Sequence, residues 1–578
     1  MHAPKQHVGN HPIFSSEMKS FVFQPKLFRT LKHYSKQTFA ADLMAGIIVG
    51  IVALPLAIAF GIASGVSPEK GIITAIIAGF IISLLGGSKV QIGGPTGAFI
   101  VIVYGIIAQY GEKGLIVATI MAGVLLILLG LFKLGTIIKF IPYPIVVGFT
   151  SGIAVTIFTT QIKDLFGMTT ESVPAEFLEK WACYFQHIGT IDPYSTAVGI
   201  LSIIIIVLTP RISKKIPGSL VAIVVMTLVV FLLKRYAGIT SIETIGDRFQ
   251  IKASLPGVAV PDMSWEVVKN LFPAAVTIAV LGAIESLLSA TVADGVTGDK
   301  HDSNQELLAQ GAANIITPFF GGIPATGAIA RTMTNINNGG KTPVAGLIHA
   351  VVLLLILLCL GPLTKHIPMA CLAGVLVVVA YNMSEWRTFR ALMSNPRSDV
   401  AVLLITFLLT VLFDLTVAIE VGLVIACLLF MKRVAETTNI SVLTDEIDPN
   451  ADVDVALNAE HLTIPDGVEV YEIDGPYFFG IANKFEEQMV MLHDRPKIRI
   501  IRMRKVPFID STGIHNLTIL CKTSQREGIR IILSGVNEQV HKTLEQAHFY
   551  DLLGEENICS NINIALDQAR RLLSAQKV

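Results

Sequence analysis

Charged residues are scarce in this sequence. Only 15% of its 578 residues are Asp, Glu, Lys or Arg, and 52% are hydrophobic, whereas a soluble protein carries about 25% charged residues. The formal net charge is zero, so it gives no indication of nucleic-acid binding. The composition therefore indicates a membrane protein and gives no reason to expect a nucleic-acid partner.

Cysteine is also scarce, and its spacing is irregular. The six cysteines form no CxxC pair, and three of them lie in apolar segments, where a cysteine is usually a small core residue: Cys183, Cys359, Cys371, Cys427, Cys521 and Cys559. The chain also lacks a GxxxxGK[ST] phosphate loop and any convincing nucleophile–base pair. We therefore expect no disulfide framework, no metal site, no cofactor and no enzyme activity.

One short motif occurs twice in the apolar part of the chain. Residues 93–99 read GGPTGAF and residues 321–329 read GGIPATGAI. Proline suits the first turn of a helix, so each copy predicts a helix that begins part-way through the membrane. Such a start offers free N–H groups and the positive end of the helix dipole, roughly +0.5 charge. Two of them facing each other would form an anion site, as in transporters with discontinuous helices.

The apolar segments fall into two sets of seven. They lie near residues 43–62, 70–86, 95–110, 115–132, 143–161, 194–209 and 218–234, then 270–291, 306–319, 326–337, 343–362, 367–383, 399–413 and 415–431. The motif occupies the third segment of each set, and several segments there are too short to span a core of about 30 Å. We therefore predict fourteen spans arranged as two repeats, which an odd number of spans per repeat forces to be inverted.

Basic residues between the segments predict the orientation. The first 40 residues carry six lysines or arginines against one acid, and Arg211, Arg387 and Lys432 follow spans that would end on the same side. Positive charge favours the cytoplasmic side, so both termini of this multi-pass protein are predicted to be cytoplasmic. The expected organisation is an N-terminal segment, 1–42, a transport domain, 43–433, a linker, 434–465, and a soluble domain, 466–578.

The last part of the chain has the pattern of a small α/β domain. VEVYEIDG, KIRIIRM and IRIILSG alternate as strands do, and NKFEEQMVMLHD, TGIHNLTILCKTSQREG, NEQVHKTLEQA and INIALDQARRLL are typical of helices. About 110 residues are enough for one domain.

Glu285 is the exceptional residue of the apolar part, because long apolar runs flank it on both sides. A carboxylate there costs about 2.5–3.5 kcal/mol, so it should face a cavity or a partner. Ser289 follows one turn later on the same helical face, and Thr277 precedes it by two turns. One hypothesis makes Glu285 a coupling group that binds H⁺ or Na⁺, and the other makes it a structural partner of Arg331.

Arg331 follows the second motif and would add positive potential to an anion site there. Its alternative role is that of a cytoplasmic positive anchor. Thr96 and Thr326 could offer hydroxyl groups to an oxyanion, or they could cap their own helices.

These residues resemble the SulP family of sulfate permeases, to which the animal sulfate/anion exchangers also belong. The resemblance covers essentially the whole chain. It rests on VALPLAIAFGIASG, IGGPTGAF, GAIESLLSA, the long stretch from HDSNQELLAQ to KTPVAGLIHA, and IDSTG. It implies a seven-plus-seven inverted-repeat fold with core and gate domains, an elevator-like cycle, homodimers and a C-terminal STAS domain.

The resemblance also implies functional residues. The anion would lie between the two motifs. The first motif would contribute Thr96, Gly97 and Ala98, and the second would contribute Gly327, Ala328, Ile329, Ala330 and Arg331. Glu285 occupies the position of the family's coupling acid, with Ser289 beside it. Leu56 replaces a glutamine found in many members. Glu285 and Ile329 replace an aspartate and a threonine of the Na⁺-dependent bicarbonate transporters, which favours H⁺ as the coupling ion.

In the STAS segment, Thr512 matches a position that is phosphorylated in anti-sigma factor antagonists. The alternative is structural, with Asp510 and Ser511 capping the helix that follows.

The sequence thus predicts a secondary transporter in the cytoplasmic membrane that takes up sulfate or a related oxyanion with H⁺. Open alternatives are a Na⁺/bicarbonate symporter, a C4-dicarboxylate transporter, an uncoupled channel, and a signalling protein in which the STAS domain binds a cytoplasmic partner.

Overall fold

The computed structural model describes most of the chain. The described residues are 23–32, 34–135, 142–170, 173–174, 176–212, 217–249, 264–413, 415–443, 446–447, 462–479 and 496–575. Most of the expected N-terminal segment, much of the expected linker and the helix expected at NKFEEQMVMLHD lie outside these residues. The chain divides into two compact units, Met1–Val424 and Ile425–Val578, and each is described by itself.

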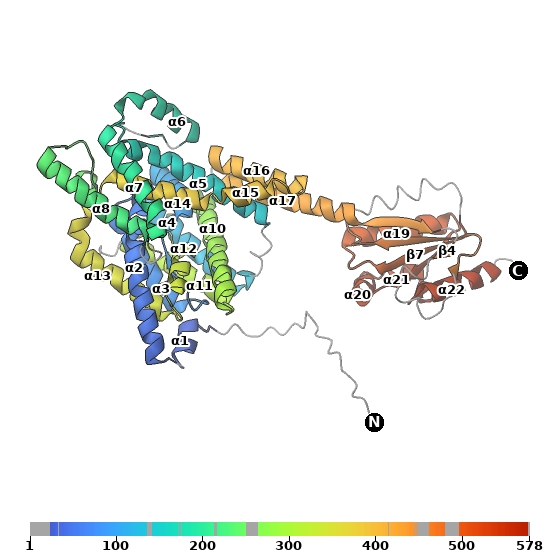
Figure 1. The fold of residues 1–578 in the computed structure, drawn as a ribbon. Helices are drawn as coiled ribbons and strands as arrows, with labels where there is room; N and C mark the ends of the chain where they lie inside the picture. The colour runs from blue at the N-terminus through green and yellow to red at the C-terminus, as the bar shows by residue number, and fades with distance from the viewer. Residues whose placement is uncertain are drawn as a thin grey trace. The chain divides into compact units, whose positions relative to one another are not determined.

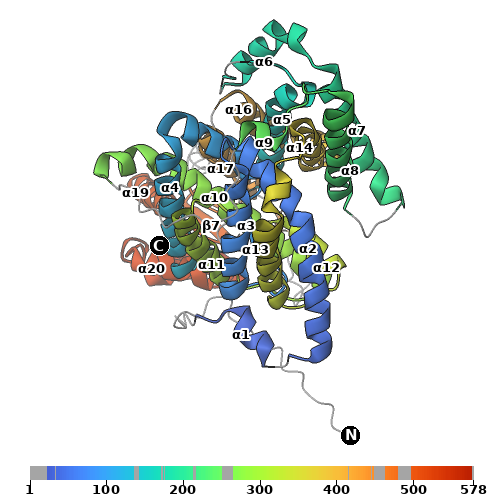
Figure 2. The same ribbon diagram turned by 90° about the vertical axis from the view of Figure 1, so that its left-hand side faces the viewer.

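The first unit contains a bundle built from both repeats. Within it, α2 packs on α3 and α13, and α4 packs on α10 and α11, and Figures 1 and 2 show α2, α3 and α13 side by side. Its members are α2 (Lys36–Ala63), α3 (Pro68–Leu85), α4 (Ile100–Leu131), α10 (Trp265–Thr297), α11 (Ser303–Ile316), α12 (Ile329–Asn337) and α13 (Val344–Thr364). We call this set the core bundle.

Small residues allow the helices of the core bundle to approach closely. A Cβ atom on Gly123 of α4 would lie 2.7 Å from the carbonyl oxygen of Gly311 on α11, and one on Gly311 would lie 2.6 Å from that of Gly123. Membrane helices use such positions because van der Waals packing, not water exclusion, holds them together.

A second group of helices packs beside the core bundle. In it, α5 contacts both α14 and α16, and α7 contacts α8 and α14. Its members are α5 (Tyr143–Phe166), α7 (Pro193–Ile212), α8 (Gly218–Leu232), α14 (Met369–Met383) and α16 (Arg397–Leu412). We call it the gate bundle. Its α8 exposes Val224, Leu228 and Phe231, as a lipid-facing helix does, because lipid is as apolar as these side chains.

Short elements connect the spans: α1 (Lys26–Leu31), α6 (Phe177–Gln186), α9 (Ile245–Arg248) and α15 (Trp386–Leu392). Each of the fourteen expected segments overlaps a helix, but the third and fourth share α4, which is kinked at Gly111, where φ is 66°. Among the described residues, eight helices are long and apolar enough to cross a membrane. The shorter α11 and α12 flank the second motif. The protein is a polytopic helical membrane protein.

The second unit begins within α17 (Leu415–Thr437) and contains a five-stranded sheet of order β3-β6-β7-β8-β9. The β3–β6 pair is antiparallel and the other pairs are parallel. The strands are β3 (Asn439–Leu443), β6 (Val468–Asp474), β7 (Ile498–Lys505), β8 (Arg530–Ser534) and β9 (Ile558–Cys559), and the main helices are α19 (Ser511–Arg526), α20 (Glu538–Gln546) and α22 (Ile562–Ala575). The three expected strands and the three expected helices in the described part are all present.

Candidate functional site

The two motifs meet as a pair of very short strands. β1 (Gly93–Gly94) lies antiparallel to β2 (Thr326–Gly327), with Gly93 opposite Gly327. One helix begins just after each strand: a 3₁₀ turn at Gly97–Phe99 that continues into α4, and α12 at Ile329. Two helices thus begin beside each other inside the core bundle.

The prolines do not occupy the place expected from the sequence. Pro95 and Pro324 were predicted in the first turn of each helix, but both lie before the first helical residue. The reason is that the Gly-Gly and Thr-Gly steps form the ladder between the repeats, and the helices start only after it.

Free N–H groups lie at both helix starts. Ala328 and Gly327 already donate their N–H groups, to the carbonyl oxygen of Ile92 at 2.9 Å and to Ser286 Oγ at 3.1 Å. Four other N–H groups lie in the first turns of the two helices, and within the described part of the chain none of them has an acceptor: those of Gly97, Ala98, Ile329 and Ala330. This set therefore supplies the donors that an anion could use.

Glu285 on α10 lies next to the first helix start. Its Oε2 atom accepts a hydrogen bond of 2.8 Å from the hydroxyl group of Thr96. Thr96 is the N-cap residue of the 3₁₀ turn, but its side chain makes no capping hydrogen bond. The carboxyl group is thus hydrogen-bonded to Thr96, which immediately precedes the free N–H groups of Gly97 and Ala98.

Arg331 does not pair with Glu285. The side chain is only 2% exposed, and it donates to the carbonyl oxygens of Pro95 at 2.5 Å and Gly93 at 3.4 Å. Its burial argues against the alternative role of a surface anchor. The guanidinium group instead joins α12 to the first motif and places a full positive charge beside both helix starts.

The hydroxyl group of Thr326 does not cap α12 either. It donates its only proton to the carbonyl oxygen of Gly282 at 3.0 Å. The Ser286 hydroxyl group is therefore the donor in the hydrogen bond of 2.5 Å between Ser286 and Thr326. Ser286 also accepts the N–H of Gly327. This network fixes β2 to α10 and leaves no hydroxyl proton of Thr326 for an anion.

Sequence reasoning missed Ser286 and Gln91. The side-chain amide of Gln91 donates to the carbonyl oxygen of Ser286 at 3.1 Å, and a Cβ atom on Gly327 would collide with that amide. The predicted Ser289 instead donates to Thr332 at 3.2 Å. The available signal was the polar pair Glu285–Ser286, but adjacent positions on a helix do not share one face, so helical spacing from Glu285 does not indicate Ser286.

The site borders the gate bundle. A Cβ atom on Gly97 would lie 2.8 Å from Met383 Sδ on α14 and 3.4 Å from Ile157 Cδ1 on α5. An anion at the first helix start would therefore lie at the boundary between the two bundles. No group of three His, Cys, Asp or Glu side chains among the described residues could hold a metal ion.

In the second unit, Thr512 is exposed in the first turn of α19. The cap is Asp510 alone, whose carboxylate accepts the N–H groups of Gly513 at 2.7 Å and Phe479 at 3.2 Å. Ser511 is the first helical residue and not a cap. The hydroxyl group of Thr512 is accessible, and its phosphorylation stays a prediction.

Comparison with known proteins agrees with this architecture. Residues 39–406 match the sulfate permease family model and residues 461–565 match the STAS domain model. YvdB of Bacillus subtilis, provisionally named a sulfate transporter, is 42% identical over 91% of this chain and 97% of its own. The bicarbonate transporter BicA of Picosynechococcus is 30% identical over 84% of this chain and 87% of its own.

A solved structure has the same fold. The murine Slc26a9 anion transporter superposes with a TM-score of 0.84 over 99% of this chain and 97% of its own, at 20% identity. The two family models and the relative with 42% identity confirm the predicted family: the chain belongs to the sulfate permease family and carries a C-terminal STAS domain.

Proposed function

We propose that the protein is a secondary active transporter that takes up a small oxyanion together with H⁺ across the cytoplasmic membrane. The observation that carries this proposal is the hydrogen bond of 2.8 Å between Thr96 and Glu285. It holds a carboxyl group beside two helix starts whose free N–H groups and buried arginine attract an anion.

The coupling follows from electrostatics. An ionised Glu285 within about 6 Å of a bound anion opposes it by roughly 3 kcal/mol at an effective dielectric constant of 20. A proton on the carboxyl group removes this repulsion and restores about two decades of affinity. The anion and the proton therefore bind best together, which is the requirement for symport.

Movement of the site is proposed to be elevator-like. The paired strands join both helix starts to the core bundle, and Gly97 meets Met383 and Ile157 of the gate bundle. The core bundle would then carry the anion past the gate bundle. A homodimer and a cytoplasmic partner of the STAS domain remain predictions.

Sulfate is the first candidate substrate, because the relative with 42% identity is named for sulfate. Bicarbonate is the second, because BicA is 30% identical. Free N–H groups bind either oxyanion, and a C4-dicarboxylate also carries suitable oxygens.

Uptake of radiolabelled sulfate, bicarbonate and fumarate into proteoliposomes tests this function. With an inward proton gradient and no Na⁺, we expect accumulation of one label above its equilibrium level. A strict requirement for Na⁺ would favour a Na⁺/bicarbonate symporter. Flux without any gradient dependence would contradict symport and indicate exchange or a channel.

A further inference from the structure

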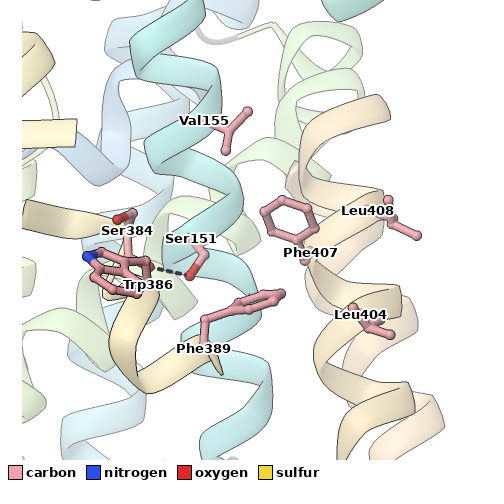
Figure 3. A pocket seen from close by; sticks show the side chains of 8 residues that line it. All are labelled: Ser151, Val155, Ser384, Trp386, Phe389, Leu404, Phe407 and Leu408. Carbon is pink, nitrogen blue, oxygen red and sulfur yellow. Dashed lines mark hydrogen bonds between the residues drawn. The ribbon is translucent and has the colours of Figure 1, made fainter. Parts of the chain in front are cut away.

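An apolar cavity lies in the gate bundle, and none of the predicted site residues lines it. Its volume is about 340 Å³, and it is lined by α5, α16 and the segment from the end of α14 into α15 (Figure 3). Trp386 and Leu408, which line it, are 44% and 50% exposed. The cavity therefore opens to the outer surface of the bundle.

The walls of this cavity suit only an apolar occupant. Phe389 and Phe407 form an edge-to-face pair with ring centroids 5.3 Å apart, and aliphatic side chains complete the lining. The Ser151 hydroxyl group donates to the carbonyl oxygen of Ser384 at 2.6 Å, and the Ser384 hydroxyl group donates to that of Tyr381 at 2.7 Å. Both hydroxyl protons are thus already used, and a polar ligand would lose its hydration without compensation.

Three exposed arginines accompany the cavity: Arg387, Arg390 and Arg397. Arg390 is one helical turn beyond Trp386 on α15, and the guanidinium group of Arg387 lies 5.7 Å from the Trp386 ring centroid. In the described part of the chain, none of the three forms an ion pair with a carboxylate. Only Glu385 and Asp399 are acidic between residues 385 and 399, so the stretch carries net charge +1.

Arg397 lies on the same stripe of α16 as the cavity residues. Leu404 and Leu408 follow it by seven and eleven residues, and at such spacings side chains share one helical face. Eleven residues of α-helix rise about 16 Å, close to half of a hydrocarbon core of about 30 Å. The stripe therefore runs from a positive charge along an apolar path about as deep as one membrane leaflet.

We propose that this cavity binds an anionic membrane phospholipid. One acyl chain lies against Leu404 and Phe407, and the phosphate group is held by Arg390 and Arg397. Arginine suits this role because its planar fork bonds phosphate oxygens in pairs. Trp386, whose Nε1–H donates to the hydroxyl group of Tyr381 at 3.1 Å, would mark the level of the headgroups, where Trp and Tyr are enriched.

The test uses the full-length protein in detergent with added phosphatidylglycerol or phosphatidylcholine of identical acyl chains. Native mass spectrometry counts the retained lipids and reports the oligomeric state. We expect phosphatidylglycerol to be retained preferentially, and Arg390→Gln or Arg397→Gln to weaken its retention roughly five-fold each, as about 1 kcal/mol per basic residue implies. The matched control is Arg211→Gln, an exposed arginine at the end of α7, which should change nothing.

A second variant tests the acyl chain. Leu404→Trp should fill the cavity and remove the retained lipid, whereas Leu201→Trp on the lipid-exposed face of α7 should not. Equal retention of both lipids, or unchanged retention in Leu404→Trp, would overturn the proposal. A Leu404→Trp protein that loses its dimer but keeps its lipid would also overturn it, in favour of a second copy of the chain covering the cavity.

Discussion

Glu285 and Arg331 lie beside the same motif, yet they form no ion pair with each other. Glu285 accepts from Thr96, and Arg331 donates to the backbone of the first motif. Among the described residues, no carboxylate therefore neutralises the positive charge of Arg331, and no paired cation holds the carboxyl group of Glu285 in its ionised form.

Replacing Glu285 by Gln should abolish proton-driven accumulation while preserving anion binding and exchange. The amide is permanently neutral, so the repulsion of roughly 3 kcal/mol is absent at every pH. Uptake in proteoliposomes with and without a pH gradient measures this. Glu266→Gln, an exposed glutamate at the start of the same helix α10, is the control. Persistent proton-driven accumulation in Glu285→Gln would refute the coupling role.

Replacing Arg331 by Ala should weaken anion affinity by roughly 30–100-fold, as expected for a charge about 6–8 Å from the anion at a dielectric constant of 20. It should also destabilise the fold by about 1–3 kcal/mol, because two buried carbonyl oxygens lose their donor. Arg331→Lys keeps the charge and should recover most of the affinity. Equilibrium binding and thermal unfolding separate the two effects, and an unchanged affinity in the alanine variant would exclude an electrostatic role.

At the scale of elements, the β1–β2 pair is the feature on which the site depends. Gly94 has φ of 152°, and a Cβ atom there would collide with the guanidinium group of Arg331. Gly94→Ala should therefore break the pair and reduce uptake at least about ten-fold, since strain and collision add. Gly105→Ala on α4, where a Cβ would meet no atom within 4 Å, should keep full uptake. Normal uptake by Gly94→Ala would show that the pairing is dispensable.

The sequence was sufficient to predict the spans and the two helix starts, because apolar length and the Gly-Pro motifs are local signals. It could not predict the strand pair, since each strand has only two residues and pairs across more than 230 positions. Nor could it choose Ser286 over Ser289. Helical spacing shows which residues share a face with Glu285, but which face meets β2 depends on how α10 and α12 pack.

At the scale of the whole molecule, the connection between α5 and α7 contacts the core bundle. Lys180 on α6 is 3% exposed, and its ammonium group lies 5.6 Å from the ring centroid of Tyr104 on α4. Burial lowers the pKa of Lys180 to about 8 from 10.5. The charged form is thus disfavoured by up to about 3 kcal/mol, more than a cation–π contact of about 0.5–1 kcal/mol opposes.

The sign of this effect gives a pH dependence. The cost of burying charged Lys180 is complete below pH 8 and declines as the pH rises from 8 toward 10.5, so α6 should cover Tyr104 more firmly at alkaline pH. Hydrogen-exchange protection factors of α6 should rise between pH 7 and pH 9.5. Lys180→Met should be well protected at both values. Equal protection of the native chain at the two pH values would contradict the buried charge.

The ladder between β1 and β2 also has a consequence for the origin of such a chain. A single seven-span repeat would possess one interrupted helix and one glycine strand with an unpaired edge inside the membrane, where unpaired backbone groups are costly. Two copies resolve that defect by pairing their edges, and the same encounter brings two helix starts together. A gene duplication would then have supplied both stability and the proposed anion site in one step. Neither half would have needed to bind a substrate on its own before the duplication.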